Sequence, residues 1–316
     1  MAINQKEIDL AYRCADLYHN HDASEFEISQ KLDISRPKVS RLLALARDLG
    51  IITISIKPPE LFNQIELERS LTAQYHLQNV LIGIPKDNTD ASIQSAIASR
   101  FLEAFQNLLK PDIRIGIGVG STIYATSRML RLNGPVPPRI SLFPLMGLAG
   151  RTDPAYQVNN IIDLFAEPLG ANRNYLMAPA IFENTVQKDV FYKSQQVFEI
   201  VSMWEKLDVA VFGIGGPIER SAILFSSFPE KYLVQFVQSH AVGDILAHFF
   251  DLEGKLVCPE AEAVLLSISF SALKAIPQRI SLAGGLWKLN SIKTALRSNL
   301  ITILVTDLLT AQNLVE

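Results

Sequence analysis

A glycine-rich segment with two hydroxyl side chains, IRIGIGVGSTIYATSRML, has the residue types that bind phosphate groups. Gly118 and Gly120 would let the backbone approach an anion closely, and Ser121 and Thr122 add hydroxyl donors. A helix that begins at Ser121 would also point its free N–H groups at the anion. The spacing matches neither a P-loop nor a dinucleotide-binding fingerprint. The segment therefore predicts an anion site, with an ordinary turn that needs positive φ as the alternative.

Other polar residues follow apolar segments later in the chain. FGIGGP is a second glycine-rich strand end, and Asp244 follows a glycine in AVGDILAHFFDLEGK. Lys288, in LAGGLWKLNSIKTAL, lies at the start of a predicted helix. There it could meet a ligand phosphate or simply be solvated. Asp307, in LVTDLLTAQNL, is a candidate general base or a cap of the final helix.

These segments need a scaffold, and the pattern from Val80 onward indicates one. Apolar runs alternate with helical patterns, which predicts a parallel sheet covered on both faces, an α/β fold of the doubly wound, Rossmann-like type. Ligands of such sheets bind beyond the carboxyl ends of the strands. The predicted strands are NVLIGI, RIGIGV, ISLFPL, YLMAPA, LDVAVFGIG, RISLAGG and ITILVT.

The first 50 residues have a different, helical pattern. Ser24 and Glu27 form a capping box that predicts a short helix from about residue 25 to 32. After a tight turn, Ser35 would cap a second helix, with Pro37 in its first turn and Gly50 at its end. Two short helices joined in this way are typical of a helix-turn-helix.

The second of these helices has the residues to read DNA at its start. Between residues 31 and 57, six basic side chains stand against two acidic ones, a local balance of +4 in a chain of net charge −3. Arginine and lysine can contact phosphates and guanine. An ordinary helical hairpin with solvated charges is the alternative. The residues predicted to face DNA are Ser35, Arg36, Lys38, Ser40 and Arg41.

The connection between the two parts is marked by Pro58 and Pro59. The segment IITISI before them predicts a strand. An amphipathic helix after them, over about residues 60–75, could pack on the body or pair with its copy in a second subunit. We therefore predict a helix-turn-helix DNA-binding domain at 1–57, a linker helix at 58–78, and an α/β domain at 79–316 that would bind its ligand beyond the strand ends.

The composition excludes several classes of protein. The chain is 48% hydrophobic, enough for a sizeable core, yet no apolar run approaches a membrane span, and the N-terminus does not resemble a signal peptide. Cys14 and Cys258 are far apart, which favours a reduced, cytoplasmic protein. His19 and His21 would face different sides of a helix, so no metal site is expected. We expect no cofactor.

Taken in order, the motifs resemble the SorC family of bacterial transcriptional regulators. The resemblance covers nearly the whole chain and is carried by EISQKLDISRPKVSRLL, GIGVGST, LDVAVFGIG, AVGDILAHFFDLEG, SLAGG with Lys288, and ITILVTDLLTA. It implies a helix-turn-helix followed by a sugar-binding effector and oligomerisation domain, at 79–316, that is related to sugar-phosphate isomerases. It also implies a homo-oligomer, usually a tetramer, that binds operator DNA and responds to a sugar or sugar phosphate.

The resemblance also implies roles for individual residues. Gly118, Gly120, Ser121 and Thr122 correspond to the phosphate-binding turn, Asp244 to a residue near the sugar hydroxyls, Lys288 to a phosphate ligand, and Gln157 to a sugar contact in some members. One departure is Met146, in FPLMGLAGRTD, because some members have a basic residue in this loop and one subgroup uses a lysine there covalently. A covalent mechanism is therefore not expected.

Three functions fit these features. The first is a DNA-binding regulator of a carbohydrate-utilisation operon controlled by a sugar or sugar phosphate. The second is a sugar-phosphate isomerase-like enzyme, for which Asp244 and Asp307 form no obvious acid–base pair and the helix-turn-helix has no role. The third is a carbohydrate-binding module without regulatory output, which the basic helix argues against.

Overall fold

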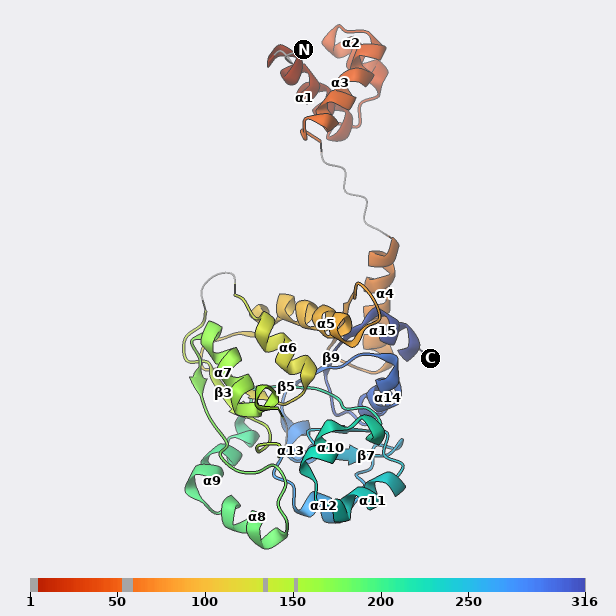
Figure 1. Cartoon of the computed structure of the whole chain (residues 1–316). Coiled ribbons are helices and arrows are strands. Elements are labelled where there is room, and N and C mark those ends of the chain that lie inside the picture. Colours follow the sequence, from red (N-terminus) through yellow and green to blue (C-terminus); the bar gives the residue numbers. More distant parts are fainter. Residues whose placement is uncertain (1–4, 53–58, 133–135, 151–152, 316) are drawn as a thin grey trace. The chain divides into compact units, whose positions relative to one another are not determined.

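The computed structural model describes residues 5–52, 59–132, 136–150 and 153–315. Its contacts divide the chain into two compact units, Met1–Leu61 and Phe62–Glu316. Figure 1 shows a small helical unit and a larger unit built around a sheet. The predicted α/β fold is confirmed. The predicted boundaries of the three domains stay a prediction.

The small unit consists of three helices, α1 (Gln5–His19), α2 (Glu25–Leu32) and α3 (Arg36–Asp48). The predicted capping box is present: the Ser24 N–H donates to the Glu27 carboxylate at 2.8 Å, and the Ser24 hydroxyl accepts from the Glu27 N–H. Asp33, in the left-handed region at φ 51°, ends α2 and turns the chain towards α3.

The core of the small unit is formed by small and branched side chains on the facing sides of the three helices. Helix α3 buries Val39, Leu42 and Leu43 against Ile28 of α2 and Cys14 of α1. The opposite side of α3 is exposed. Most of the predicted strand IITISI lies outside the described residues, and its first two residues form a bend.

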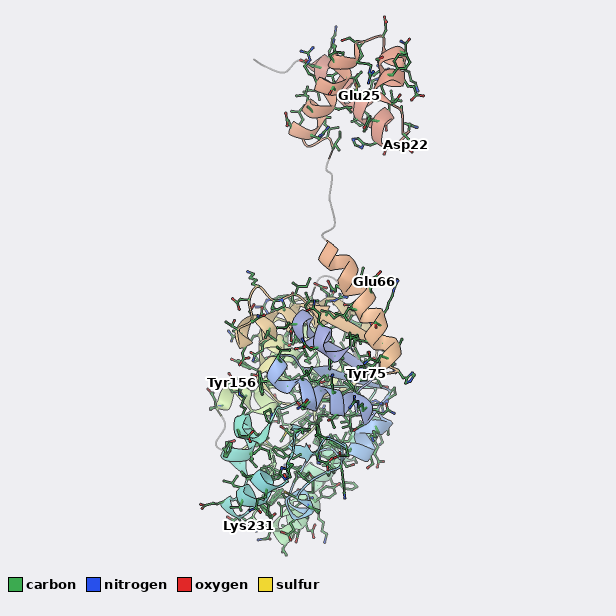
Figure 2. All side chains as sticks on the ribbon, turned by 90° about the vertical axis from the view of Figure 1, so that its right-hand side faces the viewer. Asp22, Glu25, Glu66, Tyr75, Tyr156 and Lys231 are labelled. Atoms are coloured by element: carbon green, nitrogen blue, oxygen red, sulfur yellow. The ribbon has the colours of Figure 1, made fainter. Side chains whose placement is uncertain are left out.

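Helix α4 (Pro59–Gln74) packs on the larger unit from Gln64 onward. Leu71 is buried, and Gln64 donates from its amide to the carbonyl of Ile82 at 2.8 Å. Tyr75, labelled in Figure 2, donates from its hydroxyl to the carbonyl of Leu314 at 2.8 Å. The described side chains therefore favour packing on the body, although Ile65 is half exposed and leaves a contact with a second copy open.

The larger unit is built on a seven-stranded parallel sheet with the order β1-β9-β8-β5-β2-β3-β4. A two-stranded antiparallel hairpin, β6–β7, is inserted between β5 and β8. The strands are β1 (Asn79–Gly83), β2 (Arg114–Ile117), β3 (Ser141–Pro144), β4 (Asn172–Arg173), β5 (Val209–Phe212), β6 (Gly243–Ile245), β7 (His248–Phe250), β8 (Gln278–Leu282) and β9 (Ile303–Asp307).

Helices cover both faces of the sheet, as its apolar strands require. One core joins the sheet to α5, α6 and α7, and the other joins its opposite face to α4, α14, α15 and the segments around the hairpin. The helices are α5 (Asp90–Phe105), α6 (Ser121–Met129), α7 (Val158–Leu169), α8 (Thr185–Tyr192), α9 (Gln195–Val201), α10 (Ala222–Ser227), α11 (Glu230–Gln238), α12 (Pro259–Ala263), α13 (Phe270–Ala275), α14 (Leu289–Arg297) and α15 (Leu308–Leu314).

One predicted strand is wrong. YLMAPA alternates buried and exposed residues as a strand would, but the chain there is irregular, and the nearby strand β4 is only Asn172–Arg173. Pro179 explains part of this, because it has no N–H to donate to a ladder. The segment instead forms isolated bridges, with Leu148 on one side and, through Ile181, with Leu265 on the other.

The strand order places a topological switch point between β2 and β5. From β2 the chain continues outward through β3 and β4, whereas from β5 it continues in the other direction through β8 and β9. The connections after β2 and β5 therefore diverge to opposite faces of the sheet and leave a crevice at the carboxyl ends of these two strands.

Candidate functional site

A pocket of about 400 Å³ lies at this crevice. Residues after β2, β5 and β8 line it, together with the turn of the β6–β7 hairpin and, from the connection after β3, Ala149 and Tyr156. Tyr156 is labelled in Figure 2. The structure brings five of the seven predicted effector residues into the wall of the pocket: Gly120, Ser121, Thr122, Asp244 and Lys288.

The β2 end of the pocket is a helix N-terminus. Gly120 is the N-cap of α6 with φ 132°, a conformation that side chains rarely adopt, and no side chain caps the helix. The first N–H groups of a helix have no partner within it, so those of α6 are available to a ligand anion. Ser121 adds a hydroxyl, which accepts a hydrogen bond from the Gln94 amide at 3.0 Å.

Gly118 lies behind this turn and does not line the pocket. A Cβ there would be 2.8 Å from a methyl group of Leu246 and 2.9 Å from Cβ of Phe212, so the strand end, the hairpin turn and β5 can approach one another only at a glycine. Gly118 therefore sets how closely the β2 turn and the hairpin meet.

Gln157 also lies outside this pocket. Its amide pairs with the backbone of Ala149, accepting from the Ala149 N–H at 3.1 Å and donating to the Ala149 carbonyl. It borders a separate, shallower hollow next to Met177 and Pro179. The paired amide holds the loop after β3, and a direct contact of Gln157 with a ligand stays a prediction.

Asp244 is placed in the pocket by the hairpin. Its carboxylate accepts from the Ala247 N–H at 3.1 Å across the turn, and its carbonyl accepts from the Gly215 N–H at 2.8 Å. A Cβ at Gly215 would overlap the carboxylate, so this glycine is what leaves room for it. Burial raises the pKa of Asp244 to about 6, although the Ala247 N–H, Lys288 and His248 each lower it.

This raised pKa predicts a pH-dependent stability. The folded protein holds the Asp244 proton up to about pH 6, whereas the unfolded chain releases it near pH 3.8. The contribution of Asp244 is therefore greatest below pH 4 and is lost as the pH rises through 6, by about 3 kcal/mol in all. Urea unfolding of Asp244→Asn, compared with the parent protein at pH 4.5 and pH 7.5, should show the variant gaining relative stability at the higher pH. An unchanged difference would contradict it.

Lys288 is the last residue of a short 3-10 turn, Leu286–Lys288, and the N-cap residue of α14. Burial lowers the pKa of its ammonium, although Asp244 and Asp90 raise it. No ion pair within 4.0 Å joins Lys288 to either carboxylate among the described residues. The pocket therefore presents an ammonium that lacks a bonded counter-ion, which favours an anionic ligand group.

Asp307 has a structural role. It is buried, its carboxylate accepts from the N–H groups of Gly285 and Thr310 at 2.8 and 2.9 Å, and the Thr310 hydroxyl donates to it at 2.6 Å. It thus caps α15 and holds the turn that leads to Lys288. With these donors around it, Asp307 does not face the pocket as a general base.

Replacing Asp307 by alanine is expected to lower the free energy of unfolding by about 3 kcal/mol, because the cap of α15 is lost and the buried N–H and hydroxyl of Thr310 both lose their acceptor. Chemical denaturation measures this. Asp87→Ala is the matched control, since Asp87 accepts from Thr89 in an exposed turn, and it should cost well under half as much. Equal costs for the two variants would show that Asp307 has no special role.

Several residues of the pocket were not predicted from the sequence, and two of them have large polar or aromatic side chains next to predicted segments. Arg220 follows the FGIGGP turn, and Trp287 directly precedes Lys288. Their positions next to glycine-rich strand ends could have identified them as candidates. That they lie near each other could not be predicted, because it depends on β5 and β8 being neighbours in the sheet.

The predicted DNA-facing residues lie together at the start of α3. Ser35, Arg36, Lys38, Ser40 and Arg41 are all exposed, while Val39 between them is buried. Ser35 is in the N-cap position, but its side chain makes no capping hydrogen bond. None of the three basic side chains forms an ion pair within residues 5–52. The helix thus offers three unpaired cations on its exposed side, next to its N-terminus.

A metal-binding cluster and a membrane-spanning helix are both absent from the described part of the chain. No cluster of three or more histidine, cysteine or acidic side chains there could hold a metal ion. No described helix combines the length and the apolar character that crossing a membrane requires.

Comparison with known proteins agrees with these features. Residues 59–316 match the sequence profile of a family described as "Putative sugar-binding domain". The sorbitol operon regulator of Klebsiella pneumoniae is 28% identical over 99% of both chains, and transcriptional regulator LsrR of Escherichia coli is 31% identical over 93% of this chain and 90% of that protein. The deoxyribonucleoside regulator of Bacillus subtilis is 26% identical over 99% of both.

A solved structure is similar over the whole length as well. The full-length sorbitol operon regulator SorC from Klebsiella pneumoniae superposes with a TM-score of 0.77 and covers 99% of this chain and 100% of its own. The likeness therefore includes both the helical unit and the sheet unit.

Proposed function

Because this chain belongs to the SorC family of sugar-binding transcriptional regulators, we propose that it is a DNA-binding regulator of a carbohydrate-utilisation operon whose DNA affinity is controlled by a sugar or sugar phosphate. The relatives that match it over nearly their whole length are named as a sorbitol operon regulator, a deoxyribonucleoside regulator and transcriptional regulator LsrR. A relation of the sugar-binding domain to sugar-phosphate isomerases, which the family resemblance implies, is compatible with the parallel sheet.

The observation that carries the proposal is the composition of the pocket at the switch point. A free helix N-terminus with Ser121 and Thr122 and an ammonium without a bonded counter-ion, Lys288, suit a phosphate. Asp244 suits sugar hydroxyls, which can donate to its carboxylate. We assign ligand contacts to these residues and to Gly120, a supporting role to Gly118, and keep Gln157 as a candidate sugar contact from the adjacent hollow.

The DNA contacts are assigned to α3. Its exposed residues Ser35, Arg36, Lys38, Ser40 and Arg41 would enter the major groove, with the arginines and the lysine on phosphates or guanine. The protein would act in the cytoplasm as a homo-oligomer, a tetramer by family resemblance, so that two reading helices face two half-sites. The ligand would shift the population of the arrangement that binds DNA.

The direct experiment measures binding of the upstream DNA of the chain's own operon, at low salt, with and without a panel of sugars and sugar phosphates. We expect binding without ligand to be salt-dependent and one compound of the panel to change the affinity. A thermal-shift screen of the same panel identifies the ligand independently of DNA, since a ligand that binds only the folded state raises its stability. A chain that binds no upstream DNA at low salt would refute the proposal.

One observation favours a second candidate, a sugar-phosphate isomerase-like enzyme. Asp244, with a pKa of about 6, could exchange a proton with a bound sugar near neutral pH. Turnover of ribose phosphates that Asp244→Asn abolishes would establish this activity. The helical unit has no role in such an enzyme, and for that reason the regulator is preferred.

A further inference from the structure

Trp287 stands at the wall of the pocket with a cation from each of two loops against its ring. The Lys288 ammonium is 4.8 Å from the ring centroid, and the Arg220 guanidinium carbon is 5.0 Å from it. Both distances are within the range in which the negative face of an indole attracts a cation. One aromatic ring thus contacts the two basic side chains that line the pocket among the described residues.

The ring itself is held from two further sides. It packs on the backbone of Gly216, where a Cβ would overlap the ring, and the indole N–H donates a long hydrogen bond of 3.4 Å to Asp90 at the start of α5. Trp287 therefore does not swing freely, and it ties the loop after β8 to the loop after β5. A fixed ring can fix the cations that rest on it.

Two cations near one ring repel each other, and burial disfavours the charged form of Lys288. The indole offsets part of both costs without neutralising either charge, which a carboxylate in its place would do. Both positive charges then stay available to a ligand, and the ring holds the two side chains at the pocket.

We propose that Trp287 is a positioning residue that holds Lys288 and Arg220 together at the pocket, and that this pair sets the affinity for the anionic group of the ligand. The inference rests on the proposed function only in requiring that the pocket binds an anion. It makes no use of DNA binding.

The test is a double-mutant cycle with inorganic phosphate as the probe. Calorimetry on the full chain measures the phosphate affinity of each variant. Trp287→Leu should bind phosphate about tenfold more weakly, equivalent to about 1.4 kcal/mol, as for a partly desolvated cation on an aromatic face. Trp287→Phe should recover most of this loss because it keeps an aromatic face. In the parent protein, Arg220→Gln should weaken phosphate binding. In the Trp287→Leu protein the same change should weaken it by less than twofold, because Arg220 is then no longer held by the ring.

Trp204→Phe is the matched control. This second tryptophan is buried and donates from its indole N–H to the Pro144 carbonyl, away from the pocket, so its loss should leave phosphate affinity unchanged. In the Trp204→Phe protein the remaining tryptophan is Trp287, and its fluorescence should follow the phosphate titration.

Each possible result either supports or overturns the inference. Additive effects of Trp287→Leu and Arg220→Gln, phosphate affinity unchanged in Trp287→Leu, or absence of phosphate binding by the parent protein would overturn the inference. If the cycle is non-additive but no sugar of the panel changes the DNA affinity, the inference is supported and the proposed function is rejected. Additivity in a protein that does respond to a sugar would reject the inference alone.

Discussion

Replacing both Arg36 and Arg41 by alanine is expected to weaken binding to operator DNA by about a hundredfold, since each lost contact to a base or phosphate costs about 1–3 kcal/mol. Both side chains are exposed at the start of α3 and have no ion-pair partner in the described helical unit, so the fold should not change. Electrophoretic mobility shift or fluorescence anisotropy at fixed salt measures the affinity, and ligand binding should be intact.

Arg47→Ala is the matched control. It removes one positive charge from the same helix, against two in the double variant, and does so at the C-terminal end, away from the predicted reading surface. We expect only a small loss, of the size of one peripheral phosphate contact, and a salt slope lower by about one unit. If Arg47→Ala matched the double variant, or if the double variant bound DNA like the parent protein, α3 would not be the reading helix.

The second large effect is expected from Lys288→Met. Methionine keeps most of the apolar stem but removes the ammonium, and a charge-assisted hydrogen bond of up to about 3 kcal/mol corresponds to a loss of roughly a hundredfold in affinity for a phosphorylated ligand. DNA binding without ligand should be unchanged, so the variant should bind DNA but no longer respond. Calorimetry with the ligand from the thermal-shift screen measures the ligand affinity. DNA titration with and without that ligand measures the response.

Lys293→Met controls for the loss of a charge from α14, because Lys293 lies on the same helix but does not line the pocket. It should leave both ligand affinity and the response intact. An unphosphorylated ligand is distinguished in the same experiment, since its affinity would fall much less in Lys288→Met than that of its phosphorylated form. A full response in Lys288→Met would remove Lys288 from the site.

Local signals in the sequence predicted what depends on local interactions. The capping box of Ser24 and Glu27 begins α2 as expected, because each group needs only a partner three residues away. The glycine-rich ends after β2, β5 and β8 could be found because buried parallel strands are continuous apolar runs. That these ends converge followed from the general rule for such sheets.

What could not be predicted depends on neighbours distant in the sequence. The order of the strands decides that Arg220 and Trp287 meet, and no periodicity encodes that order. The hairpin that positions Asp244 turns through Leu246 and Ala247 at positive φ, without the asparagine or glycine that usually marks such a turn. Gln157 has the residue type of a sugar contact, but its amide is paired with the backbone of Ala149.

The pairing of β1 with β9 has a consequence for synthesis on the ribosome. β1 lies at an edge of the sheet and, among the described residues, pairs with β9 alone, Asn79 with Ile303 and Gly83 with Asp307. The first strand of the sheet must therefore wait without a strand partner until β9 has emerged from the ribosome, a closure over a long sequence separation that slows folding. Asp307, which holds the turn before Lys288, is part of β9. A nascent chain should thus be unable to sense its ligand until β9 is made, and a chain cut before β9 should lack both a complete sheet and a responsive pocket.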